Sequence, residues 1–550
     1  DADMLIVRAV YGGNDISGSI FNRGKNKPTD LTLKVAQGLP EGLASFVFSQ
    51  NTATNVFIGN VFGGGNGDYT YDNDLDNKGK LQINLVEEQL PNDEDETIVT
   101  FKNLNKPEAD YAYLQIEGGT FGNIYGGGNN ATILKQTDIY YGINDAVIKP
   151  LKGIPSENLS WLKLYEGFTK DNENNTFDLT YNAFRIFGGN NLAEMSIRPK
   201  WHLKSGTVGN IYSGGNKGKM TNPNGIILTI TSPDLKAHNV YGGCRMANVE
   251  PKDADAIAEE TYTYHSYNYP VGNGTFDENY EAEYKFKEGY AARVLVTDGK
   301  INNLYGGNDI SGKVHFGTNV ELRGAISGDV YGGGNGSYAY TDKAEWIKSH
   351  PEDADYFYES GSTNSIDAMY AYRPHVEKTL LHITGIGSTA PPVYVTGGVY
   401  CGGNSATLAK DGNRDDATAT FEIGKHVVIN SVFLGSNGKN MIAEDILQKY
   451  ANKDFSSITL TDSAQFAKYM EAVAVNLKPT ITWEWDDDAV PGMNDANATE
   501  AYIGAFYCGG NVGSMTTLEQ MNMTFPKGLT IFDRIVGGCN SASIPAKDSL

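Results

Sequence analysis

The chain has 550 residues, including 64 glycines and 33 tyrosines, and its formal net charge is −23. Because binding to nucleic acid or to anionic lipid needs a clustered positive surface, this charge predicts neither as a partner. No apolar run reaches the roughly 18 residues of a membrane-spanning helix, so no membrane insertion is expected. The four cysteines are too few for a disulfide scaffold.

A short glycine-rich motif is repeated along the whole chain. VYGGNDISG (10–18) returns as LYGGNDISG (304–312) with eight of its nine residues unchanged. Recurrence of this kind is typical of repeat proteins. Most copies pair an aliphatic with an aromatic residue, and the twelve are VYGGN (10–14), VFGGGN (61–66), IYGGGN (124–129), IFGGN (186–190), IYSGGN (211–216), VYGGCR (240–245), LYGGN (304–308), VYGGGN (330–335), VYCGGN (399–404), VFLGSN (432–437), FYCGGN (506–511) and IVGGCN (535–540).

The twelve copies form two matching sets of six. The first members share NDISG and the sixth members share GGC, which indicates duplication of a six-unit ancestor. We therefore expect a single domain over 1–550, built from halves at about 1–289 and 290–550. The unequal spacing of the copies predicts insertions at about 67–112, 134–183, 251–289, 341–378 and 441–500.

Each short unit has the pattern of three short strands. In VLVTDGKINNLYGGNDISGKV (294–314), alternating Val294 and Val296 are followed by a glycine corner, a strand with Ile301 and Leu304, the GGN corner and a third strand. Three strands per unit is the layout of a parallel β-helix of about twelve coils. Helical spacing of apolar residues within 441–475 adds a small helical insertion to this all-β fold.

The Gly-Gly-Asn corner suggests a physical role for each residue. Gly and Asn tolerate positive φ and allow a sharp bend, and stacked asparagine amides can satisfy one another from coil to coil. The aliphatic residue of the motif should face the core. The aromatic residue should then face outward, either covered or exposed, unless the corner turns it inward. Arg245 breaks the expected structural asparagine corner, which comprises Asn14, Asn66, Asn129, Asn190, Asn216, Asn308, Asn335, Asn404, Asn437, Asn511 and Asn540.

The insertions carry the predicted ligand-binding residues. Two of them, within 251–290 and 341–375, are rich in aromatic and acidic residues. Aromatic side chains can stack on sugars or anchor a protein partner, although they can equally lie flat as a lid on the solenoid. The residues selected for ligand binding are Tyr264, Tyr267, Tyr269, Trp346, Tyr356 and Tyr358.

One acidic stretch resembles half of a calcium loop. Asp72, Asp74 and Asp76 have the D-x-D-x-D spacing, but Asn77 stands where a calcium loop has glycine and Ile83 stands where it has glutamate. Calcium is therefore one interpretation and a solvated acidic turn is the other, and no further cofactor is expected.

The eight histidines are scattered and no nucleophile, phosphate-loop or zinc motif occurs, so we expect no enzyme activity.

The repeat also resembles a known type. IEGGTFGNIYGGGNNATI (116–133) is similar to the GGxFxxVYGGGxxAxV repeats of large secreted or surface-attached proteins of gut-dwelling bacteria, and the likeness extends from about 5 to 545. The resemblance implies a right-handed, single-stranded parallel β-helix outside the cell with an adhesive or surface-binding role. The long insertions depart from that pattern. The shared motif is architectural, so it transfers no functional residues.

The sequence thus predicts a non-enzymatic binding or adhesion protein, extracellular or on a cell surface. Its expected partner is a glycan or a surface protein, and the chain is expected to be a monomer. The start at Asp1, with no signal peptide in the sequence, suits a mature or trimmed product and does not by itself establish export. The alternatives are a structural stalk or spacer, and a polysaccharide lyase or glycoside hydrolase.

Overall fold

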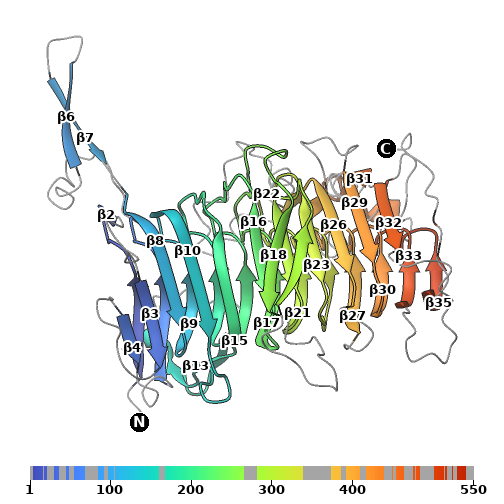
Figure 1. The fold of residues 1–550 in the computed structure, drawn as a ribbon, viewed down its shortest axis with the longest axis horizontal. Helices are drawn as coiled ribbons and strands as arrows, with labels where there is room; N and C mark the ends of the chain where they lie inside the picture. The colour runs from blue at the N-terminus through green and yellow to red at the C-terminus, as the bar shows by residue number, and fades with distance from the viewer. Residues whose placement is uncertain are drawn as a thin grey trace.

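A computed structural model describes the parts of the chain that carry the repeat. The described residues are 4–16, 18–20, 30–35, 45–48, 55–68, 85–91, 97–103, 106–159, 168–265, 281–338, 373–385, 392–408, 417–438, 449, 454–463, 475–476, 478–483, 501–512, 515–516, 523, 525 and 529–540. They form an all-β protein dominated by parallel sheets (Figure 1). This confirms the predicted fold class at the level of its β-strand content and its parallel pairing.

The largest sheet contains one strand from every copy of the motif. Each of these strands pairs in parallel with the next, in chain order along the length of the molecule (Figure 1). The twelve are β1 (Leu5–Tyr11), β5 (Val56–Phe62), β9 (Thr120–Tyr125), β14 (Ala183–Phe187), β15 (Pro199–Tyr212), β17 (Asp234–Tyr241), β21 (Lys300–Tyr305), β24 (Val330–Tyr331), β27 (Val393–Tyr400), β30 (Val427–Phe433), β33 (Ala501–Tyr507) and β35 (Leu529–Val536).

The same sheet is widened near the N-terminal end by five further strands. β8 pairs in parallel with β2, β3 and β10, and β10 pairs with the first part of β15. β4 pairs with β3. The five are β2 (Ser19–Ile20), β3 (Asp30–Val35), β4 (Ser45–Phe48), β8 (Glu108–Ile116) and β10 (Thr132–Gly142).

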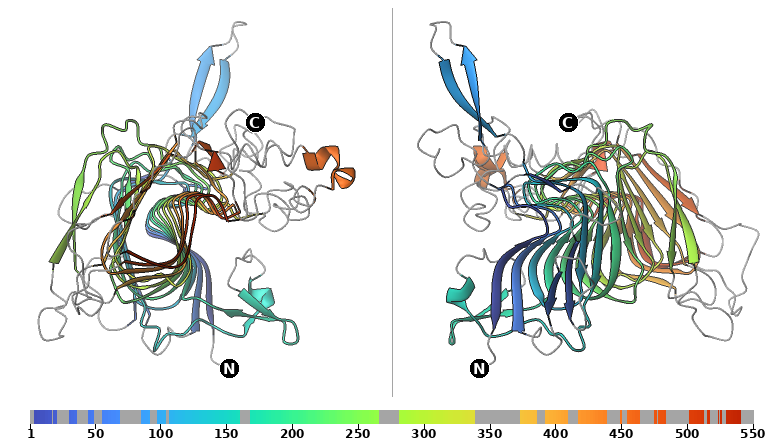
Figure 2. Two further views of the ribbon diagram at one scale, coloured as in Figure 1. Left: turned by 90° about the vertical axis from the view of Figure 1, so that its right-hand side faces the viewer. Right: turned by 60° about the vertical axis from the view of Figure 1, so that its left-hand side comes forward.

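Further parallel sheets take the other strands of each unit. The segment 294–314 contributes β20, β21 and β22 to three different sheets, as its three-strand pattern predicts. Figure 2 shows these layers in the view along the row of strands, and they are compatible with a β-helix. The strands are β16 (Ile226–Ile230), β20 (Ala292–Val296), β23 (Thr318–Leu322), β26 (Lys378–Ile383), β29 (Thr418–Ile423) and β32 (Lys478–Trp483) in one sheet, β22 (Lys313–Val314), β25 (His375–Val376) and β28 (Thr407–Leu408) in another, and β31 (Val475–Asn476) with β34 (Met515–Thr516) in the last.

Antiparallel hairpins and short helical turns lie in the predicted insertions. Two hairpins are formed by β6 (Leu85–Pro91) with β7 (Thr97–Asn103) and by β18 (Glu260–His265) with β19 (Glu281–Phe286). A three-stranded antiparallel sheet contains β11 (Ile154–Pro155), β12 (Phe168–Asp171) and β13 (Thr176–Leu179). The 3₁₀ helices are η3 (Ser156–Leu159) and η6 (Phe455–Ser457), and 460–463 is helical. Most of the predicted helical insertion at 441–475 lies outside the described residues.

Within those ranges, the chain has no helix that combines the length and the apolar character needed to cross a membrane.

The aliphatic residues of the motif form the core. From Val61 to Phe506 each of them is fully buried, whereas Ile535 on the last strand is 53% exposed. This packing confirms the predicted inward direction for the buried copies. They join one continuous hydrophobic cluster with the apolar residues of the six-stranded sheet.

The aromatic residues of the motif form a second buried layer, here called the aromatic row. Neighbouring rings stack with centroids 4.5–4.9 Å apart and planes within 10° of parallel. The row belongs to a cluster separate from the aliphatic core, and its rings after Tyr11 are buried. The rings are therefore covered, and do not form an exposed stacking surface. The row comprises Tyr11, Phe62, Tyr125, Phe187, Tyr212, Tyr241, Tyr305, Tyr331, Tyr400, Phe433 and Tyr507.

The glycines of the motif allow the backbones of neighbouring copies to lie close together. The prediction that these glycines are needed for positive φ is wrong. None of the described motif glycines is among the residues with positive φ; that conformation occurs after the motif, for example at Gly18 and Gly312. A Cβ added to Gly306 would instead lie 2.3 Å from the carbonyl oxygen of Gly332 in the next copy. Neighbouring copies thus pack backbone against backbone at the corner.

The corner side chains form a hydrogen-bonded line, here called the corner row, at the fourth residue after the aromatic. From Asn66 onward, all but one of its residues donate a side-chain hydrogen bond of 2.7–3.1 Å to the preceding copy. The exception is Asp309, which accepts bonds. The row is Asp15, Asn66, Asn129, Asn191, Asn216, Arg245, Asp309, Asn335, Asn404, Asn437, Asn511 and Asn540.

Three of the predicted corner asparagines lie one position too early for this row. Asn14, Asn190 and Asn308 occupy the place of the third glycine in GGGN copies. Asn308 accepts from the backbone N–H of Cys244 at 2.8 Å and donates to the carbonyl of Ala247, so it ties backbones together. The prediction is therefore wrong at these three positions, and Arg245 is a member of the row.

Candidate functional site

The predicted ligand-binding aromatics fall mostly outside the described residues. Tyr264 lies in β18. Tyr267, Tyr269, Trp346, Tyr356 and Tyr358 lie outside the described ranges, as do the predicted calcium ligands Asp72, Asp74 and Asp76. The binding roles of all nine remain predictions.

The described part of the insertion 251–289 covers the six-stranded sheet. Tyr284 and Phe286 of β19 are buried against Ile227 and Leu295. The hydroxyl of Tyr262 on β18 lies 3.1 Å from that of Thr229. These rings therefore act as a lid, which is the alternative that the sequence left open for the insertion.

A partly exposed aromatic cluster lies elsewhere, on the outer face of β8, β10 and β15. The Tyr140 ring stacks on His202 with centroids 3.9 Å apart and planes within 1° of parallel, and Tyr113 lies 5.0 Å away on its other side. Strand alternation puts these three side chains on the face opposite the core, and all three are half-buried. The rings offer a continuous apolar surface across three adjacent strands.

Planar polar side chains flank this cluster. The Tyr113 hydroxyl donates to Gln115 at 3.1 Å, and Gln115 donates to Glu117, which directly follows β8. On β10, the Gln136 amide donates to both oxygens of Asp138, at 2.9 and 2.7 Å. Rings bordered by fixed amides and carboxylates suit a ligand with one apolar face and many hydroxyl groups, because both parts find a partner. We call this set the outer face.

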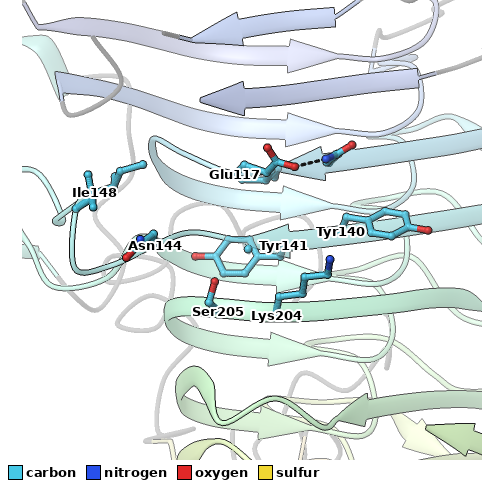
Figure 3. A pocket seen from close by; sticks show the side chains of 11 residues that line it. Glu117, Tyr140, Tyr141, Asn144, Ile148, Lys204 and Ser205 are labelled. Atoms are coloured by element: carbon cyan, nitrogen blue, oxygen red, sulfur yellow. Dashed lines mark hydrogen bonds between the residues drawn. The ribbon is translucent and has the colours of Figure 1, made fainter. Parts of the chain in front are cut away.

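A pocket of about 310 Å³ adjoins the outer face at the ends of β8 and β10. Glu117, Tyr140 and Lys204 belong to its lining, and Asn144 and Ser205 line it as well (Figure 3). The register of β10 and β15 shifts between Tyr141 and Gly142, where the pocket lies. A shift of this kind interrupts regular strand pairing and re-aims side chains, which accounts for an opening in an otherwise tightly paired sheet.

Tyr141 lines this pocket from the core side. Its side chain is 1% exposed and its hydroxyl has no hydrogen-bond partner among the described residues. Figure 3 shows the Tyr141 hydroxyl directed towards Asn144, while the Tyr140 ring extends the opposite way. An unsatisfied buried hydroxyl costs about 1–3 kcal/mol. A ligand or water that reaches it would recover part of this cost.

Both phenols stay protonated at neutral pH. Burial, and secondly the charge of Asp138, raises the pKa of Tyr140. Burial, and secondly Asp145, raises the pKa of Tyr141 well above its usual range. Each hydroxyl can therefore donate a hydrogen bond to a neutral, oxygen-rich ligand.

The sequence signal for the outer face was present but weak. ADYAYLQIEGG (109–119) places Tyr111, Tyr113 and Gln115 at alternating positions, which indicates one face of a strand. Only the pairing of Gln115 with Tyr140 and of Tyr140 with His202 brings the three strands together.

The described residues contain no group of three or more His, Cys, Asp or Glu side chains placed to hold a metal ion. Comparison with known proteins found no matching family model, no matching curated protein and no matching solved structure.

Proposed function

We propose that this chain is a non-enzymatic extracellular binding protein that recognises glycan through its outer face. The observation that carries the proposal is the Tyr113–Tyr140–His202 cluster with its flanking carboxylates and amides beside a 310 Å³ pocket. Sugar rings present an apolar C–H face and an edge of hydroxyls, so they pair with aromatic faces and planar polar groups. The scaffold we propose is a right-handed parallel β-helix of about twelve coils, and the working unit is a monomer.

A structural stalk is the second candidate. A stalk needs a covered aromatic row, and the rings from Phe62 to Tyr507 are buried. It needs neither a partly exposed aromatic cluster nor an adjoining pocket. The binding role is therefore favoured by the outer face, and the stalk role by the aromatic row.

A glycan array covering mucin and plant polysaccharides, run with and without calcium, tests the proposal. We expect selective binding, and we expect Tyr140→Ala to weaken it at least tenfold, because the change removes the central ring of the stack. Tyr140→Phe keeps the ring and should retain most of the binding. Dependence on calcium would favour the Asp72, Asp74 and Asp76 loop as a metal site.

The matched control is Tyr394→Ala. Tyr394 is 46% exposed on β27 of the same sheet, away from the outer face. Equal weakening of glycan binding by Tyr140→Ala and Tyr394→Ala would refute the outer face as the binding site. Binding to no glycan on the array would favour the structural stalk.

A further inference from the structure

The pocket beside the outer face has a buried floor and an exposed rim. Its floor consists of Ile116, Tyr141 and Ile148, which are 0%, 1% and 3% exposed. On its rim, Val147 is 50% exposed and Lys204 is exposed as well. The volume of about 310 Å³ lies at the lower end of the roughly 300–1,000 Å³ of small-molecule sites. The pocket therefore suits one sugar ring with its substituents better than a longer stretch of glycan.

One wall of the pocket is the turn that follows β10. The N–H groups of Val147 and Ile148 both donate to the carbonyl oxygen of Asn144, at 3.0 and 2.8 Å. The buried Asn182 donates from Nδ2 to the carbonyl oxygen of Ile148 at 3.0 Å, which fixes the end of the turn. Figure 3 shows Asn144 and Ile148 on one side of the pocket and Tyr140 on the other. A glycan that lies over Tyr140 would meet this fixed wall, which favours the end of a chain over its middle.

The floor offers apolar surface and one hydrogen-bonding group. Ile116 and Ile148 belong to the hydrophobic core cluster, and the Tyr141 hydroxyl has no hydrogen-bond partner among the described residues. This hydroxyl is protonated at neutral pH and can donate to an acceptor on the ligand. A sugar hydroxyl placed on this floor would lie against the isoleucines without a partner for most of its bonds. A group that combines a methyl with a carbonyl oxygen satisfies both parts of the floor.

The rim does not select a charged sugar. Among the described residues that line the pocket, the charged groups are the carboxylate of Glu117 and the ammonium of Lys204. One charge of each sign gives the opening no net charge, so it favours neither acidic nor basic sugars over neutral ones. Both groups can still form hydrogen bonds with sugar hydroxyls, one as acceptor and the other as donor.

We propose that this pocket binds the terminal N-acetylated amino sugar of a glycan whose neighbouring sugars lie on the outer face. The acetamido carbonyl accepts a hydrogen bond from the Tyr141 hydroxyl, and the acetamido methyl packs against Ile116 and Ile148. The hydroxyls of the same sugar meet Glu117 and Lys204 at the rim. This inference rests on the proposed glycan-binding function and names the sugar that the site selects.

Ordered water is the competing occupant of the floor. A buried water needs about two to four polar partners, whereas the floor offers the Tyr141 hydroxyl between two isoleucines. A water held by so few bonds is displaced at little cost by a group that replaces its hydrogen bond and also buries apolar surface. The floor therefore favours the acetamido group.

A glycan array with paired termini tests the proposal. Each pair presents one underlying glycan capped by N-acetylglucosamine or by glucose, or by N-acetylgalactosamine or by galactose, so its members differ only in the acetamido group. We expect the acetamido member to bind at least about tenfold more tightly in the preferred pair, because it adds a hydrogen bond and a buried methyl. The position of the sugar is tested with glycans that carry it only within the chain, which should bind more weakly.

Tyr141→Phe tests the floor, because it removes the hydroxyl and keeps the ring. It should weaken binding of the acetamido member about fivefold more than binding of its partner, which is the size of one neutral hydrogen bond. The unfolding temperature should not fall, since the hydroxyl has no partner among the described residues. Tyr394→Phe is the matched control. It removes the same hydroxyl from an exposed tyrosine of β27 that does not line the pocket, and should leave the preference unchanged.

The possible failures are distinguishable. Equal binding of the paired termini, or equal effects of Tyr141→Phe and Tyr394→Phe, would overturn the acetamido assignment and leave glycan binding by the outer face standing. Equally tight binding of glycans that carry the acetamido sugar only within the chain would overturn the recognition of chain ends. Binding to no glycan at all would overturn the proposed function and this inference together.

Discussion

Gly306→Ala is expected to destabilise the fold by about 3 kcal/mol or more, although it adds a single methyl group. The new Cβ would lie 2.3 Å from the carbonyl oxygen of Gly332 and 2.8 Å from Cγ2 of Val320. Backbone pairing on both sides holds these atoms, since Gly306 donates to the carbonyl of Tyr331 and Gly332 donates to that of Tyr400. The corner cannot open without breaking the neighbouring ladder. Urea unfolding followed by far-UV circular dichroism measures the loss.

Gly537→Ala is the control at the same place in the motif. A Cβ at Gly537 meets no atom within 4 Å, so its effect should stay within about 0.5 kcal/mol. If both variants lost stability equally, the cost would come from the backbone preference of glycine, and our account of the motif by close approach of neighbouring copies would fail.

The strand pattern could be predicted from the sequence because it is local. Alternation around Val294 and around Ile301, broken by glycine, marks two strands that the structure places in different parallel sheets. The direction of the motif's aliphatic residue follows from the same alternation. Burial of the aromatic row does not follow from it, because the chain has to fold back at the corner before the rings are covered.

The corner row was only partly predictable because its residues share a position in the motif but not a residue type. The asparagine stands three residues after the aromatic in GGN copies and four in GGGN copies, whereas the structure pairs neighbouring copies at the aromatic, as with Tyr305 and Tyr331. A GGN copy therefore contributes the residue after its asparagine, which is how Asp309 joins the row. The outer face was missed for a different reason, since its side chains come from β8, β10 and β15, whose pairing is not local: residues 117–131 and 143–198 separate these strands in the sequence.

Asp309→Ala is expected to destabilise the protein by about 3–5 kcal/mol, because it removes a buried carboxylate on which three groups depend. Asp309 is 2% exposed and accepts hydrogen bonds from the Tyr212 hydroxyl at 2.7 Å, from Nδ2 of Asn335 at 2.9 Å and from the Tyr338 hydroxyl at 2.7 Å. Tyr212 is buried as well, so its hydroxyl would lose this acceptor with little access to water. Asp309→Asn keeps the size but has one acceptor oxygen fewer, and should lose less.

Asp15 provides the comparison, because it occupies the same NDISG position in the first half of the chain. It is exposed there and accepts from Nδ2 of Asn66 at 2.9 Å, so Asp15→Ala should cost less than about 1 kcal/mol. The two substitutions remove the same atoms from the same motif, so their urea midpoints compare a buried carboxylate and its hydrogen bonds with an exposed one. Equal losses would mean that the three bonds at Asp309 contribute no more than the contacts of the exposed Asp15, and that the buried carboxylate has no special structural role in the corner row.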